Sequence, residues 1–326
     1  AAAAPPPPAR AEAASNDAAD WIARWKRSEP GPSVAPRAAP APDGHRYSYV
    51  YVHDVDGSPE SFTGLYLRDA LQARGAELRS PDVSGGGGAS TYTIDGAVGA
   101  LAAFVESETD PGMPLRLSGF GFGAVAAAEY AAANPSRVDS LLLLSPRFDA
   151  AGCAGRMAGG GGGEGEGLEA LKRWAASGEG RVGPGGVEVG AGFASSCLRR
   201  AGEVPFVRCL AYVVHGWHDA LAPLDDSVNW VRNASVHMRR TGMPTEEVPE
   251  RRLVEVDDDQ ALSASFKLLL PRVLDWYRLL SAEDFAAAAE RLEGTTQADF
   301  ARGHEYNFEV YENYLRSLGL TKEDLE

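Results

Sequence analysis

The residues around position 121 have the spacing of a turn that presents a nucleophile, although the nucleophile itself is missing. Residues 115–124 read Leu-Arg-Leu-Ser-Gly-Phe-Gly-Phe-Gly-Ala, so Gly119 and Gly123 flank Gly121 in the frame G-x-S-x-G. Glycines at the outer positions permit a sharp turn from strand to helix, in which the central residue stands out at the end of the strand. Such a turn serves attack on an acyl carbon, and Gly121 has no side chain that attacks.

Short apolar strands alternate with helical segments between about residues 46 and 280. This order predicts an α/β body with a doubly wound, mainly parallel sheet of about six strands. The glycine-rich stretch 151–192, which contains an unbroken glycine run at 159–163, is expected to form surface loops. The predicted strands are 47–53, 76–81, 115–118, 141–145, 208–215 and 252–256, and the predicted helices are 61–74, 94–106, 122–133 and 266–280.

Residues 46–280 resemble the α/β-hydrolase superfamily, particularly its small esterase-like members. The resemblance rests on the turn at 119–123 and on further segments that occur in the order typical of that family. In this resemblance Gly121 stands at the nucleophile position, Asp219 at the acid position and Gln260 at the position of the general base. The loop with His53 and Asp54 looks like the one that supplies an oxyanion-hole amide. The further segments are 52–59 (VHDVDGSP), 80–82 (SPD), 134–138 (NPSRV), 143–146 (LLSP), 215–223 and 254–260.

The departures from the family pattern predict a catalytically inactive member, a pseudoenzyme. Gly121 removes the nucleophile, and the amide of Gln260 does not titrate near neutrality, so it cannot take a proton. Asp219 is intact but lacks a matching histidine to orient. Asp54 replaces the loop glycine, and its charge opposes the charge that an oxyanion hole stabilises. Residues 151–192 stand where the family inserts a lid, and their glycines are expected to prevent a well-packed helical cap.

Other residues offer weaker routes to chemistry. Ser118 lies on the strand and is expected to be buried, and His218 is expected to be a polar loop residue. The acidic run 257–259 lacks the ligand spacing of a calcium loop and is expected to be solvated. The glycines at 119–123 lack the Lys-Ser/Thr of a phosphate-binding loop. The sequence therefore predicts no catalytic residue, no cofactor and no metal site.

Composition excludes several classes of protein. The 326 residues carry 31 Lys and Arg against 46 Asp and Glu, and the net charge of −15 disfavours nucleic-acid binding. No apolar run approaches the roughly 20 residues that a membrane span requires. Cys153, Cys197 and Cys209 cannot all pair and form no ligand cluster, which is typical of structural thiols in a reducing compartment.

The flanks of the predicted body differ from it in composition. Residues 1–44 are an Ala/Pro-rich segment, in which 15–27 is expected to form a short helix that carries Trp21 and Trp25. Residues 281–326 are expected to form a helical extension. Both flanks are expected to dock, either on the body or on another protein. The Ala-rich, Lys-poor start suggests the remainder of an organelle transit peptide, in a chloroplast more than a mitochondrion. The candidate docking side chains of the extension are Tyr306, Phe308, Tyr311 and Tyr314.

Three functional hypotheses follow. In the first, the chain is a non-catalytic scaffold or accessory subunit of a larger complex, in an organelle or otherwise the cytoplasm, with any membrane association made through its partners. In the second, it binds a small molecule in the former substrate pocket around Gly121, Asp54 and Gln260. In the third, it is a residual esterase or thioesterase with unorthodox residues.

Overall fold

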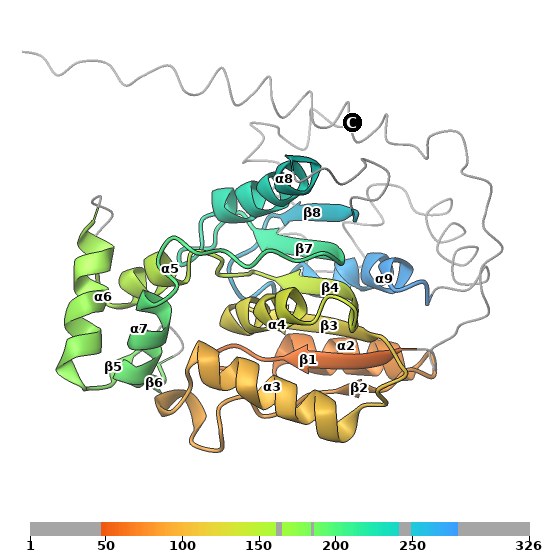
Figure 1. Cartoon of the computed structure of the whole chain (residues 1–326), viewed down its shortest axis with the longest axis horizontal. Helices are drawn as coiled ribbons and strands as arrows, with labels where there is room; N and C mark the ends of the chain where they lie inside the picture. The colour runs from red at the N-terminus through yellow and green to blue at the C-terminus, as the bar shows by residue number, and fades with distance from the viewer. Residues whose placement is uncertain (1–46, 161–164, 184–185, 241–248, 280–326) are drawn as a thin grey trace, which may run out of the picture. The chain divides into compact units, whose positions relative to one another are not determined.

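The computed structural model describes residues 47–160, 165–183, 186–240 and 249–279. A six-stranded sheet lies at its centre in the order β2-β1-β3-β4-β7-β8, and every neighbouring pair is parallel (Figure 1). This architecture confirms the predicted α/β fold with a parallel sheet. The strands are β1 (Ser48–Val52), β2 (Leu78–Arg79), β3 (Leu115–Phe120), β4 (Val138–Leu144), β7 (Leu210–Gly216) and β8 (Arg251–Val256).

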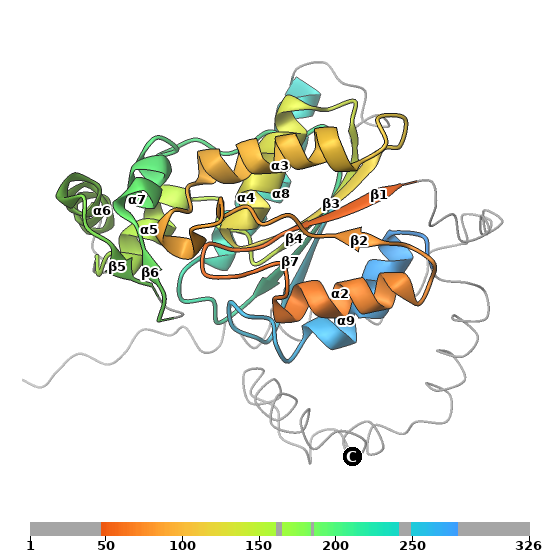
Figure 2. The ribbon, with the colours of Figure 1, turned by 90° about the horizontal axis from the view of Figure 1, so that it is seen from below.

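Helices cover both faces of the sheet (Figure 2). Tyr49 and Tyr51 of β1 point to one face while Val50 and Val52 point to the other, because successive side chains of a strand alternate. The two pairs belong to two separate hydrophobic cores, so the sheet is buried on both sides. One face carries α2 (Phe62–Gln72) and α9 (Phe266–Trp276), and the other carries α3 (Ile94–Glu108), α4 (Phe122–Ala133) and α8 (Leu224–Arg240).

The long helix α8 is not among the helices predicted from the sequence. It follows Pro223 and has Asp225 and Asp226 in its first turn, which are ordinary signals for the start of a helix. In contrast, the helix predicted at 122–133 has the same bounds as α4. The strand predicted at 76–81 is reduced to the two residues of β2, at the edge of the sheet.

The expectation that residues 151–192 form loops is wrong, because two helices and a hairpin lie in this stretch and pack with a third helix, which begins at its end, as a cap. A Cβ on Gly155 would lie 2.5 Å from the carbonyl oxygen of Gly167, so glycine lets α5 and α6 approach each other closely. Trp174 and Phe193 are fully buried, with ring centroids 5.9 Å apart. The elements are α5 (Ala150–Met157), α6 (Glu166–Ser177), β5 (Arg181–Val182), β6 (Glu188–Val189) and α7 (Ala191–Leu198).

This close contact predicts opposite effects for two alanine substitutions. Gly155→Ala should lower the free energy of unfolding by about 1–3 kcal/mol, because the new methyl group meets backbone atoms that cannot turn aside. Gly167→Ala is the matched control, since its Cβ would have no neighbour closer than 3.8 Å. Alanine is the better helix former, so the control should gain up to about 1 kcal/mol. Urea unfolding measures both, and equal stabilities would contradict the packing of α5 against α6.

One buried arginine connects the first and last parts of the described body. Arg116 of β3 is 5% exposed, and its Nε donates to Asp139 Oδ2 at 3.2 Å. Its Nη1 donates to the hydroxyl of Tyr49 and to the carbonyl oxygen of Tyr277. Its guanidinium also lies 3.5 Å from the ring centroid of Tyr47, a cation–π contact. A single side chain therefore holds residues from both ends of the body.

The predicted docking residues of the two flanks lie outside the described residues. This applies to Trp21 and Trp25 and to the aromatic side chains of the extension, Tyr306, Phe308, Tyr311 and Tyr314. Within the described ranges, no helix combines the length and apolar character needed to cross a bilayer.

Candidate functional site

Gly121 lies at a tight turn between β3 and α4. Its φ of 57° and ψ of −119° fall in a region that side chains rarely adopt. Its amide donates to the carbonyl oxygen of Leu144 at 3.0 Å. A Cβ on Gly123 would lie 2.3 Å from the carbonyl oxygen of His53, and a Cβ on Gly119 would lie 2.5 Å from the Cα of Ala124. The outer glycines are therefore required by close backbone contacts.

The carboxylate of Asp54 lies directly in front of Gly121. A Cβ built on Gly121 would be 2.2 Å from Asp54 Oδ2 and 2.6 Å from Asp54 Oδ1. These distances are far shorter than any non-bonded contact. Asp54 thus fills the space into which a nucleophilic side chain at position 121 would project.

Three donors hold this carboxylate. Asp54 Oδ1 accepts hydrogen bonds from the amides of Val55 and Phe122, both at 2.8 Å. Asp54 Oδ2 forms an ion pair with Arg147 Nη1 at 2.9 Å. The Phe122 amide follows position 121, and in an elbow of this kind that amide belongs to the oxyanion hole. A charged group of the chain itself therefore occupies a donor that would otherwise stabilise an oxyanion.

The ion pair of Asp54 and Arg147 is buried, with exposed fractions of 4% and 3%. Burial raises the pKa of the Asp54 carboxyl, and the charge of Arg147 opposes that shift. Arg147 also lies over the ring of Phe122, 4.8 Å from its centroid. Its Nε is buried without a hydrogen-bond partner among the described residues. Arg147 is not among the residues predicted from the sequence, although a charged side chain so close to the apolar run 141–144 is unusual.

Asp219, which the sequence resemblance assigns to the acid position, is held by the backbone of its own loop. Its Oδ1 accepts hydrogen bonds from the amides of Leu221 and Ala222, at 2.8 and 2.9 Å. Its Oδ2 is buried and has no hydrogen-bond partner within the described ranges. His215 Nε2 lies 3.8 Å away, which is too far for a hydrogen bond. The carboxyl group of Asp219 is thus enclosed, and within the described ranges no histidine donates a hydrogen bond to it.

His215 is a core residue. Its Nε2 donates to the carbonyl oxygen of Ala222 at 2.9 Å, and its Nδ1 lies 2.7 Å from Ser227 Oγ. The ring is fully buried, and burial lowers its pKa. Both ring nitrogens are therefore satisfied by structural partners, and the ring is neutral near pH 7.

Gln260 lies beside Asp54 in a pocket at the carboxyl end of the sheet. The pocket has a volume of about 310 Å³, and Arg147 also lines it. Apolar walls come from β1, α2, β3 and the loops after β7 and β8. The structure thus places Gln260 and Asp54 in one pocket, whose described lining residues include neither Gly121 nor Asp219. The apolar and aromatic part of the lining is Tyr51, Phe62, Phe120, Leu221 and Ala261.

The remaining residues considered from the sequence have structural partners. His53 is buried, and its Nδ1 donates to the carbonyl oxygen of Asp54 while its Nε2 accepts from the amide of Val83. Ser118 is buried as predicted, with its Oγ 2.8 Å from the hydroxyl of Tyr277. His218 is an exposed loop residue whose Nε2 lies 2.7 Å from Asp257 Oδ1.

The acidic run 257–259 is not uniformly solvated, which corrects the expectation from the sequence. Asp258 is 9% exposed, and its Oδ2 accepts hydrogen bonds from the amides of Ala264 and Ser265 at the start of α9. Its charge stabilises free amides at a helix start. In the part of the chain that the structure describes, no group of three or more His, Cys, Asp or Glu side chains is placed to hold a metal.

Comparison with known proteins places this geometry in a known fold. No family model matches the chain. A stretch of 72 residues is 39% identical to Lipase LipV of Mycobacterium tuberculosis and covers 21% of this chain and 27% of the lipase, so the chain matches about a quarter of that curated relative. Alpha/beta hydrolase domain-containing protein 10 from mouse has a TM-score of 0.54 at 15% identity, over 72% of this chain and 90% of that one. Est1E from Butyrivibrio proteoclasticus has a TM-score of 0.52 at 15% identity, over 74% and 90%.

The chain has the α/β-hydrolase fold. The similarity to the two solved structures shows this fold. In this chain the fold consists of the six-stranded parallel sheet with helices on both faces. The shorter sequence match relates part of the chain to a lipase.

Proposed function

We propose that this chain is a non-hydrolytic α/β-hydrolase-fold protein that acts by binding, as a scaffold or accessory subunit of a protein assembly. The observation that carries the proposal is the carboxylate of Asp54 in front of Gly121, held by the Phe122 amide and Arg147. A substrate carbonyl cannot reach the Phe122 amide while a carboxylate occupies it. A negative charge there also repels the oxyanion that acyl transfer would form.

The acid–base side of the site supports the same proposal. Gln260 lines the pocket where a base would be needed, and its amide cannot accept a proton near neutrality. One buried oxygen of Asp219 has no hydrogen-bond partner among the described residues, and the ring nitrogens of His215 bond to other groups. No proton path of the usual Ser-His-Asp kind exists with these side chains. Location in an organelle stays a prediction from composition.

Purified full-length chain should release no product from p-nitrophenyl esters or acyl-CoA thioesters, from short to long acyl chains. A fluorophosphonate probe, which labels activated serines, should leave it unlabelled, because position 121 has no hydroxyl group. Est1E serves as the active control of the same fold. Turnover that disappears in Ser118→Ala or in Asp219→Asn would overturn the proposal and favour a residual esterase or thioesterase.

A second candidate function is the binding of a small acyl compound in the pocket of about 310 Å³. Its apolar walls and its few polar groups are the usual composition of a ligand site. The likeness to a lipase and an esterase supports an acyl-shaped ligand. Native mass spectrometry of the purified protein tests it, because a bound compound adds mass. Gln260→Trp should remove that mass by filling the pocket, and an unchanged adduct would place the ligand elsewhere.

A further inference from the structure

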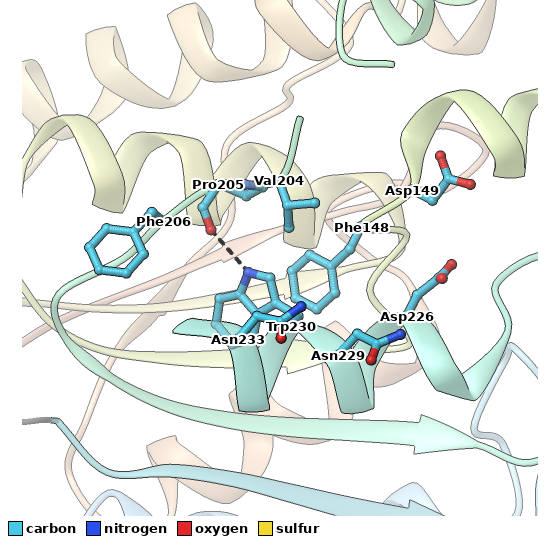
Figure 3. A pocket seen from close by; sticks show the side chains of 9 residues that line it. All are labelled: Phe148, Asp149, Val204, Pro205, Phe206, Asp226, Asn229, Trp230 and Asn233. Atoms are coloured by element: carbon cyan, nitrogen blue, oxygen red, sulfur yellow. Dashed lines mark hydrogen bonds between the residues drawn. The ribbon is translucent and has the colours of Figure 1, made fainter. Parts of the chain in front are cut away.

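A second hollow of the body lies away from Gly121, between the segment before β7 and helix α8. It consists of two adjoining pockets of about 410 and 470 Å³ that share Phe148, Val204 and Pro205. We refer to the two pockets together as the Phe148 groove. Figure 3 shows its first pocket, in which the side chains of Phe148 and Trp230 lie beneath residues 204–206.

The floor of the groove is aromatic and fixed in place. The rings of Phe148 and Trp230 are stacked, with centroids 4.5 Å apart and planes 10° apart. Trp230 Nε1 donates to the carbonyl oxygen of Pro205 at 3.0 Å (Figure 3). Both rings are almost fully buried, whereas Val204 on the rim is 52% exposed. Exposed apolar side chains beside a preformed hollow are typical of a binding surface.

The first pocket is lined by acidic side chains and, among the described residues, by no basic one. Asp149 and Asp226 line it, and none of its described lining residues is a lysine or arginine. Asp149 Oδ1 accepts from the amide of Gly152, while Asp226 Oδ2 has no hydrogen-bond partner within the described ranges. Burial, and then the charge of Asp149, raise the pKa of Asp226, and Arg156 opposes this. The donors of Arg156 are directed to Leu221 and Cys153 instead.

Four of the five charged residues that line the second pocket form ion pairs with one another, and the fifth is Glu203. Arg200 forms ion pairs with Asp95 and Glu129, and Arg199 forms one with Asp95. The groove therefore runs from an end lined by two arginines, across an apolar floor, to an end whose described lining includes no lysine or arginine. An acidic end beside an apolar floor is complementary to a partner segment that carries a basic side chain next to apolar ones.

We propose that the Phe148 groove docks a protein partner through one basic side chain flanked by apolar residues. The cationic group lies between Asp149 and Asp226, and its aliphatic stem lies along the edge of the Phe148 and Trp230 rings. Neighbouring apolar side chains of the partner contact Val204 and Pro205. An extended segment suits the hollow better than a compact ligand, because the two pockets continue into each other. The net charge of −15 favours such a partner. This inference rests on the proposed binding function and names the chemistry of the partner.

The test follows the indole N–H signal of Trp230 in a ¹H–¹⁵N NMR titration of the full chain. The chain has six tryptophans, and Trp230→Phe identifies the relevant signal. The probes are the tripeptide acetyl-Leu-Arg-Leu-amide, its citrulline counterpart and n-butylguanidinium. Citrulline has nearly the shape of arginine without its charge. The arginine tripeptide should shift the signal with a Kd on the order of 1 mM. The Kd of each of the other two probes should be higher by a factor of about ten or more.

Two aspartates that are adjacent in sequence provide matched variants. Asp226→Asn removes the charge inside the groove and should weaken the arginine tripeptide about tenfold. Asp225→Asn removes an exposed charge from the same helix turn outside the lining and should leave the Kd unchanged. Thermal melts of both variants check that each is folded. The comparison of arginine with citrulline on the unaltered chain needs no variant and gives the same answer independently.

Three results would overturn the proposal. Equal binding of the arginine and citrulline peptides would exclude a role for the charge. Equal binding of n-butylguanidinium would assign the groove to a small organic cation. Self-association of the chain that the arginine tripeptide disperses would assign it to a second copy. None of these results affects the ester and thioester assays, so a failure of the groove and a failure of the non-hydrolytic proposal can be told apart.

Discussion

Replacing Arg147 by methionine should lower the free energy of unfolding by about 3–5 kcal/mol at about pH 8. The reason is that Asp54 is 4% exposed and would keep a buried charge without its cation. Methionine fills much of the volume of arginine, so the loss reports the missing charge more than a cavity. Urea unfolding followed by circular dichroism measures it.

The same variant should depend on pH in a direction that follows from Asp54. Burial already raises the pKa of Asp54, and removal of Arg147 removes the charge that opposes this shift. A group whose folded-state pKa is raised stabilises the folded state below its unfolded pKa of about 4, and this stability is lost as pH rises through the folded pKa. Arg147→Met should therefore lose less stability at about pH 5 than at about pH 8.

The control for Arg147→Met adds Asp54→Asn. Asparagine keeps an oxygen for the amides of Val55 and Phe122 and removes the charge. The double variant should regain most of the lost stability and should show little difference between the two pH values. A loss in Arg147→Met that is the same at both pH values would contradict a buried charge at Asp54.

Gly121→Ser, which would restore the nucleophile, should destabilise the fold by about 3 kcal/mol or more. Its Cβ would lie 2.2 Å from Asp54 Oδ2, and the carboxylate is held by three donors and cannot move without breaking them. Backbone strain at a φ of +57° contributes a smaller part. Chemical denaturation measures the change in free energy.

Gly85→Ser is the matched control for backbone strain. Gly85 has a φ of +73° and no atom within 4 Å of a built Cβ, so the control should cost only about 1 kcal/mol. Adding Asp54→Gly to Gly121→Ser should relieve the clash, with a coupling of at least about 1 kcal/mol. Additive effects would show that Asp54 does not fill the space in front of Gly121. The double variant should still release no product from esters, because Gln260 remains at the position of the base.

Local signals in the sequence were sufficient for the sheet and for the turn at Gly121. Apolar strands such as 141–144 and the glycine frame 119–123 specify their own conformation, because few alternatives bury them. The glycines of the cap misled the prediction. Gly155 has the composition of a loop residue, but it serves the close approach of two helices, and only the partner backbone reveals this.

The prediction of an incomplete site rests on residue types alone, because the resemblance assigns Gly121 and Gln260 to the positions of a nucleophile and a base. The side chain that lies in front of Gly121 could not be predicted in this way. The ion pair of Asp54 with Arg147 depends on loops after two different strands that meet only in the folded sheet. The residue type of Asp54 alone indicates that its charge opposes an oxyanion. It does not show that the carboxylate accepts the hydrogen bond of the Phe122 amide.

The contacts of Arg116 have a consequence for how this body relates to a longer polypeptide. The ring of Tyr47 lies against the guanidinium of Arg116, and the carbonyl oxygen of Tyr277 accepts a hydrogen bond from it. The first and the last residues of the described body therefore lie close together. Termini that lie together are the property that makes domain insertion and circular permutation tolerable. A short linker from residue 279 to residue 47, with new ends cut elsewhere on the surface, should therefore leave the sheet order intact. In evolutionary terms, a body with neighbouring ends can be inserted as a whole domain into a loop of another protein.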